Sequence, residues 1–263
     1  MTEIAWKPYT QFDATAKKGL ASGYLAYDDQ NFYYAAKIAD NTPDPGTIRV
    51  ETRNDDEFFY PEKVYLPDGK VMTWPAGVRR YTYAKTPVLP AGNAPNFDNV
   101  QLAFNVLSEE QKPWYAYPKG TLPHFVSDWC SDYEYALNKI ADQNGGGTEI
   151  WRMKYPGMPN KHFYPRQPKS PLEGPVKNGQ LVMRHDGNTR IVECAIPWTE
   201  LPDVKKALDA GKTIKFSFRV NDDAGVGCME LARYRSVANN NPNAFKVDWT
   251  EHWGTEVEFG FAK

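Results

Sequence analysis

Hydrophobic and polar residues alternate along several parts of the chain, which is the pattern of β-strands that bury one face. The clearest alternation covers residues 32–38 and follows a shorter predicted strand at 23–27 across the polar turn 28–31. Two strands joined by so short a turn predict a hairpin. The apolar face of the second strand would consist of Phe32, Tyr34, Ala36 and Ile38.

The same period of two recurs in the rest of the chain. It predicts strands at residues 100–106, 133–137, 181–184, 190–196, 214–220 and 257–261. Asp186 and Gly187 separate two of them and suit a tight hairpin turn, because glycine tolerates positive φ. In the strand at 100–106, Gln101, Ala103 and Asn105 alternate with apolar residues, which predicts a sheet with one face in water.

One helix is predicted, at residues 202–210. Pro202 suits its first turn, Val204 and Leu208 share a face with Leu201, and Gly211 ends it. Two long stretches, 41–96 and 108–180, are rich in Pro, Gly, Asn and aromatic residues. They predict long loop insertions, and loops of that length in a compact domain usually carry function.

These elements predict an all-β fold in which two antiparallel sheets stack as a sandwich, with immunoglobulin or jelly-roll-like layering, long loops and one short helix. The chain has no internal repeat and no low-complexity linker, so we expect residues 1–263 to form a single domain. The residues expected between the sheets are Phe32, Tyr34, Leu102, Phe104, Ile196, Phe216 and Phe218.

Composition excludes some classes of partner. The 31 basic and 33 acidic residues are spread along the chain, so no basic stripe for nucleic acid is expected. No apolar stretch approaches the ~20 residues that a membrane-spanning helix needs, so no membrane span is expected. The chain is rich in aromatic residues, with 16 Tyr, 13 Phe and 8 Trp, which suits half-buried strands and aromatic binding surfaces.

Aromatic and planar polar side chains are the groups that recognise neutral sugars, because they match the C–H faces and the hydroxyls. The tryptophans in or beside predicted loops either stack on a ligand or pack a loop onto the sandwich; they are Trp74, Trp114, Trp129, Trp249 and Trp253. Trp198 follows the predicted strand at 190–196, and both Trp198 and Trp151 are expected in the core. Arg233, Tyr234 and Arg235 could bind a uronic-acid carboxylate or form a solvated strand edge.

Three blocks of the sequence occur in an order typical of a known family. The first is Ala26-Tyr27-Asp28-Asp29-Gln30-Asn31-Phe32-Tyr33 and the second is Asp98-Asn99-Val100-Gln101-Leu102. The third is Glu193-Cys194-Ala195-Ile196-Pro197-Trp198, followed later in the sequence by the strand from Ile214 to Val220-Asn221-Asp222. They resemble the "W-D-D-x-N-L-Y", "D-S-V-E-I", "VE-x-A-I-P-W" and Val-Asn-Asp motifs of the family 9 carbohydrate-binding modules, which are related to DOMON-type domains.

The resemblance implies a non-catalytic, extracellular or periplasmic domain that binds a polysaccharide or oligosaccharide and is covalently linked to a catalytic domain of a degradative system. Its sugar contacts would lie beside the Asp98 strand and after the Val-Asn-Asp strand. The candidate ligand-binding residues there are Phe97, Gln101, Arg233, Tyr234, Arg235, Trp249 and Trp253. Gln101 stands where the family's binder has a carboxylate. The resemblance also supports a structural calcium ion, for which Asp222 and Asp223 are the candidate ligands.

Two other functions stay open at this point. One is a lyase or hydrolase on the same fold, with candidate groups His124, His162, Tyr164 and Arg166. The other is a haem-binding electron-transfer domain, with candidate iron ligands Met72, Met153, Met158, Met183, His124, His162, His185 and His252. Cys130, Cys194 and Cys228 show no metal-binding spacing and are expected as buried thiols or as one disulfide with one thiol.

Overall fold

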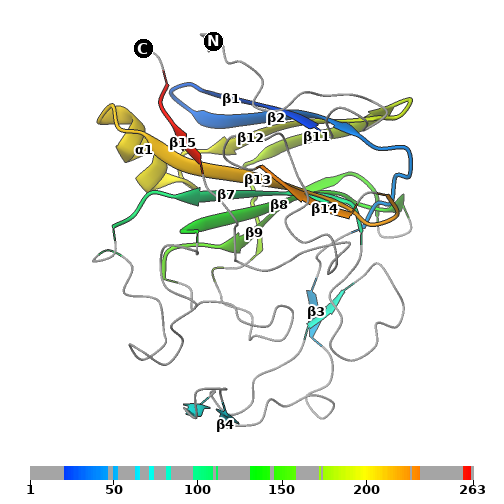
Figure 1. The fold of residues 1–263 in the computed structure, drawn as a ribbon, viewed down its shortest axis with the longest axis horizontal. Helices are drawn as coiled ribbons and strands as arrows, with labels where there is room; N and C mark the ends of the chain where they lie inside the picture. Colours follow the sequence, from blue (N-terminus) through cyan, green and yellow to red (C-terminus); the bar gives the residue numbers. More distant parts are fainter. Residues whose placement is uncertain are drawn as a thin grey trace.

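The fold is a two-layer sandwich of antiparallel sheets, with α1 at one end and β14 at the other (Figure 1). It is known from a computed structural model. The structure describes residues 21–46, 50–52, 63–65, 71–73, 81–83, 97–108, 111, 131–142, 145–157, 172, 174–225, 227–231 and 257–261. The two antiparallel sheets within these residues confirm the predicted all-β sandwich.

The small sheet has four strands in the order β1-β2-β12-β11. The predicted hairpin is formed by β1 (Ala21–Tyr27) and β2 (Asn31–Ala39). The second hairpin is formed by β11 (Gln180–Asp186) and β12 (Thr189–Pro197), and Gly187 in its turn has φ +56°. A residue with a Cβ is strained at this φ, which explains glycine there.

The large sheet has seven strands, six of them in the order β10-β9-β8-β7-β13-β14. Its members are β7 (Asn99–Asn105), β8 (Tyr133–Lys139), β9 (Thr148–Lys154), β10 (Gly174–Pro175), β13 (Ile214–Asp222), β14 (Gly227–Glu230) and β15 (Val257–Phe259). Strand β13 is central, because β7 pairs along one edge while β15 and β14 share the other. β15 pairs with residues 214–216 of β13 and β14 pairs with residues 219–222.

The hydrophobic core fills the space between the sheets. All seven residues predicted for this core are at most 2% exposed and belong to one cluster. Phe32 from the small sheet packs edge-on against Phe104 of the large sheet, with ring centroids 5.1 Å apart. Each such buried ring contributes about 1.5–3 kcal/mol of transfer free energy, so the aromatic cluster is a main source of stability.

Helix α1 (Pro202–Asp209) closes one end of the sandwich (Figure 1). It begins at Pro202 as predicted and buries Val204 and Leu208. The residues before and within it are tied to the large sheet, because the Tyr133 hydroxyl donates a hydrogen bond to Asp203 and the Arg152 guanidinium lies 2.8 Å from the Glu200 carboxylate.

The two stretches expected as long loops contain strands. The first holds two short antiparallel pairs, β3 (Val50–Thr52) with β6 (Tyr81–Tyr83) and β4 (Lys63–Tyr65) with β5 (Val71–Thr73). The second holds β8, which the sequence indicates weakly, together with β9 and β10. Both faces of β8 and β9 are buried, so their sequences do not alternate cleanly and period-two patterning fails to find β9.

The outer face of the large sheet differs from the expectation of one face in water. Gln101 and Ala103 of β7 are fully buried, and so are Ser217 of β13 and Asn138 of β8. The small sheet does follow the expected pattern, since Tyr24 on its outer face is 40% exposed. The polar residues of the large sheet are compatible with burial because they hydrogen-bond across the strands.

Candidate functional site

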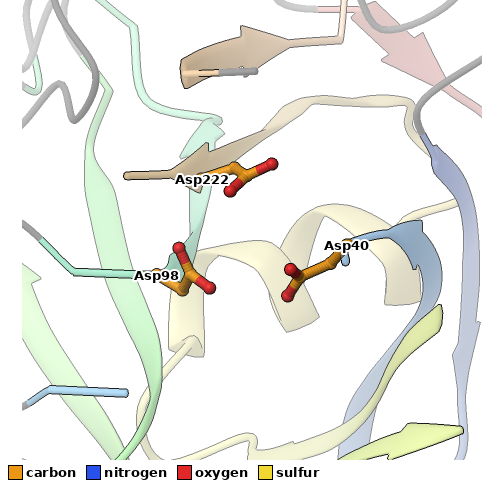
Figure 2. A group of neighbouring side chains, drawn as sticks. All are labelled: Asp40, Asp98 and Asp222. Atoms are coloured by element: carbon orange, nitrogen blue, oxygen red, sulfur yellow. The ribbon is translucent and has the colours of Figure 1, made fainter. Parts of the chain in front are cut away.

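Three carboxylates meet between the two sheets at the end opposite to α1. Asp40 follows Ile38 in the inward-facing series of β2, Asp98 precedes Val100 of β7, and Asp222 follows Val220 of β13. Because residues two apart in a strand share a face, all three point into the interlayer space. Figure 2 shows the three side chains turned toward one another. One oxygen of each lies within 4.8 Å of the others, and each residue is at most 4% exposed.

Arg190 of β12 enters the same space. Its side chain is 1% exposed, its Nε lies 2.9 Å from Asp40 Oδ2 and its Nη2 lies 3.8 Å from Asp98 Oδ2. His185 of β11 approaches Asp40 from the solvent side, with 2.7 Å between Nε2 and Oδ2. Asp40, Arg190 and His185 belong to the small sheet and Asp98 and Asp222 to the large one, so the group, here called the interlayer cluster, links the two layers electrostatically.

Asp98 also holds two backbone segments. Its Oδ2 accepts a hydrogen bond from the Asp44 N–H at 2.9 Å, and its Oδ1 accepts one from the Asp223 N–H at 3.0 Å. The Asp98 N–H in turn donates to the Asp44 carbonyl at 2.8 Å. One side chain thus fastens the segment that follows β2 and the turn that follows β13.

Burial and neighbouring charges move the pKa values of Asp40 and Asp98 in opposite directions. Burial alone would raise the pKa of Asp40, but the Arg190 guanidinium and the hydrogen bond with His185 hold it below its ordinary value. Burial raises the pKa of Asp98 to about 7, and the more distant Arg190 charge and the two N–H donors offset only part of the rise. The cluster therefore contains one firmly ionised carboxylate and one that titrates near neutrality.

The interlayer cluster fits poorly with the calcium site that the resemblance implies. Calcium takes six to eight oxygen ligands. Here the Asp40 oxygens face the Arg190 guanidinium, the His185 ring and the Thr42 N–H, and both Asp98 oxygens accept backbone N–H groups. A guanidinium already supplies positive charge at the centre, so the donor set suits a buried ion network better than a metal ion.

A second concentration of polar side chains lies on the outer face of the large sheet, which points away from the small sheet (Figure 1). We call it the polar face. It comprises Asn99 and Gln101 of β7, Glu134 and Asn138 of β8, Trp151 and Lys154 of β9, and Ser217, Arg219 and Asn221 of β13. All nine side chains are at most 4% exposed. Ala103 and Ala136 lie among them, so the middle of this face has little side-chain bulk.

Cross-strand pairs order the polar face. Gln101 is directly opposite Arg219, and its Oε1 accepts a hydrogen bond from Arg219 Nη1 at 3.2 Å. In the next row, Asn221 Nδ2 donates to Asn99 Oδ1 at 2.9 Å. Glu134 and Lys154 are opposite each other on β8 and β9. Side chains fixed in this way present planar polar groups in set orientations.

Four of the nine predicted site residues lie within the described chain. Gln101 lies in the middle of the polar face, and Asp222 belongs to the interlayer cluster. Asp223 takes part through its backbone N–H. Phe97 is fully buried against Gly46, where an added Cβ would come within 2.3 Å of the Phe97 ring. The others, Arg233, Tyr234, Arg235, Trp249 and Trp253, lie outside the described residues.

The structure describes only some of the candidate residues for an enzyme or for a haem-binding domain. Met183 lies in the core, Met153 is buried and His185 is bonded to Asp40. The candidates outside the description are His124, His162, Tyr164, Arg166, Met158 and His252, and of Met72 only the backbone in β5 is described. Trp151 and Trp198 are buried, at 4% and 8% exposure. Burial raises the pKa of the Cys194 thiol well above its ordinary value, and Cys228 is buried too.

No family model, no curated protein and no solved structure matches this chain. Within the described residues, no helix is long and apolar enough to cross a membrane.

The sequence did not reveal Asp40 and Arg190 as members of the interlayer cluster, nor Arg219 as a member of the polar face. Asp40 and Arg190 lie 150 positions apart, and each has an ordinary strand-end context in the sequence. A signal was present in β12, because Arg190 occupies an inward position of an otherwise apolar series and a buried cation needs a carboxylate. Arg219 likewise lies in a strand beside Gln101, but only the register identifies the pair.

Proposed function

We propose that this chain is a non-catalytic carbohydrate-binding domain whose ligand-contacting loops are supported by the buried polar face at the β13 side of the large sheet. The observation that carries the proposal is the buried Gln101–Arg219 pair, with 3.2 Å between Oε1 and Nη1. Because the pair is buried, it acts by fixing β7 to β13 rather than by touching the sugar, and a site on an ordered support loses little entropy on binding.

The positions of β14 and β15 support a binding site beside β13. Both strands pair with the outer edge of β13, so the chain leaves this edge after Leu231 and returns to it at Val257. The segment between them contains Arg233, Tyr234, Arg235, Trp249 and Trp253. One end follows Glu230, which is opposite Arg219, and the other begins at Val257, which is opposite Phe216, so the proposed aromatic and basic contacts and the polar face are connected through β13.

The first experiment measures binding and turnover together. The purified protein is applied to a glycan array, and soluble polysaccharides that bind are then incubated with it and assayed for reducing ends and unsaturated uronides. We expect retention of one class of glycan without release of either product. Product release would assign the chain to an enzyme on this fold, and absence of binding to every glycan would contradict the proposal.

The second experiment tests the Gln101–Arg219 pair. Gln101→Met keeps the side-chain length but removes the hydrogen bond that holds Arg219, so the support of the binding loops should loosen and affinity for the retained glycan should fall by about tenfold or more. Gln101→Glu keeps an acceptor for Arg219 and should recover part of the affinity. Tyr24→Ala, an exposed aromatic change on the small sheet, is the matched control and should bind as the unmodified chain does.

Thermal melts of the same variants separate a binding defect from a folding defect. If Gln101→Met and Tyr24→Ala bind equally well while both remain folded, the polar face does not support the binding site.

A further inference from the structure

The outer face of the small sheet, on the side away from the large sheet, carries more apolar than charged side chains (Figure 1). Tyr24 is 40% exposed and Val182 is 51% exposed, and among the described residues these are the exposed large hydrophobic side chains. The middle of the face, here called the outer apolar surface, consists of Tyr24 and Ala26 of β1, Tyr33, Ala35 and Lys37 of β2, Ile191, Glu193 and Ala195 of β12, and Val182 of β11. The wet face of an antiparallel sheet is ordinarily polar, so an exposed apolar surface there indicates an interaction site.

Strand register places the two exposed side chains at opposite ends of one row. Tyr24 on the edge strand β1 is opposite Ala35, and Val182 on the edge strand β11 is opposite Glu193. Ala35 and Glu193 are opposite each other in the middle of the row. A large aromatic side chain at one end and an aliphatic side chain at the other form a surface that a rotated copy of itself can match.

We propose that two copies of this chain associate through the outer apolar surface, with the small sheets stacked face to face about a two-fold axis that runs along the strands between β2 and β12. This symmetry exchanges β1 with β11 and β2 with β12. Tyr24 of each copy then packs on Val182 of the other, at both ends of the row. Stacked sheets lie about 10 Å apart, which leaves room for one layer of interdigitated side chains.

The charges of the surface favour a second copy as the occupant. Under the two-fold axis, Glu193 lies over Ala35 of the second copy, and Lys37 of that copy is two residues along the same strand, about 7 Å away. Both side chains are exposed, and neither has an ion-pair partner in the part of the chain that the structure describes. Each can therefore pair across the interface, and the symmetry repeats the Glu193–Lys37 contact twice.

The surface is ordered before association. The Tyr33 hydroxyl donates a hydrogen bond to Asp28 Oδ2 at 2.8 Å, which fixes the ring. The small side chains of Ala26, Ala35 and Ala195 lose no rotamer freedom, so association costs little side-chain entropy. The buried corner at Ser22 lies outside the surface.

The size of the surface determines how strong the association is. Four strands about 4.8 Å apart, each about seven residues long, form a face of roughly 19 by 24 Å, or about 450 Å² on each copy. Two copies would bury about 900 Å² in total, which is typical of weak and reversible complexes. We therefore expect a monomer–dimer equilibrium with a dissociation constant on the order of 10–100 µM.

The test is sedimentation equilibrium of the full chain from about 1 to 500 µM, a range that spans the expected dissociation constant. Val182→Lys removes the contact with Tyr24, and Glu193→Lys brings like charges together, so each should weaken dimerisation by about tenfold or more. The exchange of charges, Glu193→Lys with Lys37→Glu, should restore dimerisation because opposite charges meet again. Lys212→Glu, an exposed charge reversal outside the surface, is the matched control and should dimerise as the unmodified chain does.

Three results would overturn the proposal. The first is a monomer at every concentration, and the second is a dimer that Val182→Lys and Glu193→Lys leave unchanged, because another surface would then join the copies. The third is a folded charge-exchange variant that does not regain dimerisation.

Folding and glycan binding are measured on the same variants. Val182, Glu193 and Lys37 are exposed in the single chain, so the circular dichroism of the monomeric variants should match that of the unmodified protein. The stacked small sheets leave both large sheets on the outside, so retention on the glycan should not change. Loss of dimerisation is thereby distinguished from loss of the proposed binding function.

Discussion

The residue that most affects the interlayer cluster is Arg190. Its side chain is 1% exposed and its Nε lies 2.9 Å from Asp40 Oδ2, so removing the guanidinium leaves buried carboxylates without their cation. Arg190→Met retains much of the apolar volume and should destabilise the fold by about 3–5 kcal/mol in urea denaturation near neutral pH. The matched control is Arg184→Met on the exposed strand β11, for which a change within about 0.5 kcal/mol is expected.

The cost of Arg190→Met should depend on pH in a defined direction. Arg190 is one of the groups that lower the pKa of Asp40, and a lowered carboxyl pKa stabilises the fold above the ordinary value of 3.8. The difference between the two proteins should therefore shrink as pH falls into the range where Asp40 is protonated. A cost that is the same at acid and neutral pH would show that lost packing, not lost charge, is the cause.

Single residues also show what the sequence can and cannot reveal about a site. Gln101 and Asp222 were candidates because they occupy recognisable strand motifs, and both lie in polar groups of the structure. Their partners Arg219, Asp40 and Arg190 are brought to them by strand register and by the stacking of two sheets. Neither relation is visible in one sequence, because contacts between distant segments leave no local pattern.

At the scale of elements, local patterns were sufficient where one face of a strand is apolar and the other is polar. The hairpins β1–β2 and β11–β12, strand β13 and helix α1 were all predicted within a few residues. Strand β9 was missed because Ile150, Trp151, Met153 and Lys154 are all buried, so its two faces do not differ in the usual way. The expectation of a wet face on β7 was wrong for the same reason, since both faces of the large sheet are buried around Gln101.

The β11–β12 turn offers a test of backbone conformation alone. Gly187 has φ +56°, and a Cβ placed there meets no atom within 4 Å. Gly187→Ala should therefore cost about 1–2 kcal/mol through backbone strain without any steric clash. Gly260→Ala is the matched control, because its Cβ meets Thr213 at an ordinary 3.7 Å and its φ lies outside the range +20° to +160°, so its stability should change little. Equal stabilities of the two variants in urea denaturation would contradict the turn geometry.

At the scale of the whole molecule, the two polar groups occupy different positions in the sandwich. The interlayer cluster closes the core at the end opposite to α1, whereas the polar face lies on the far side of the large sheet. Strand β13 joins them, because Asp222 points inward into the cluster and Arg219 and Asn221 point outward into the polar face. The last residues of one strand thus belong to both sets of polar side chains.

The central claim, that this sandwich binds carbohydrate beside β13, is tested most directly by isothermal titration of Trp249→Ala and Trp253→Ala with the glycan that the unmodified chain retains. If either ring stacks on a sugar, its loss should weaken binding by about 1–3 kcal/mol while the melting temperature changes little. A variant that instead loses about 3–5 kcal/mol of folding stability would identify that tryptophan as a packing residue. Unchanged affinity in both folded variants would contradict the proposed binding surface.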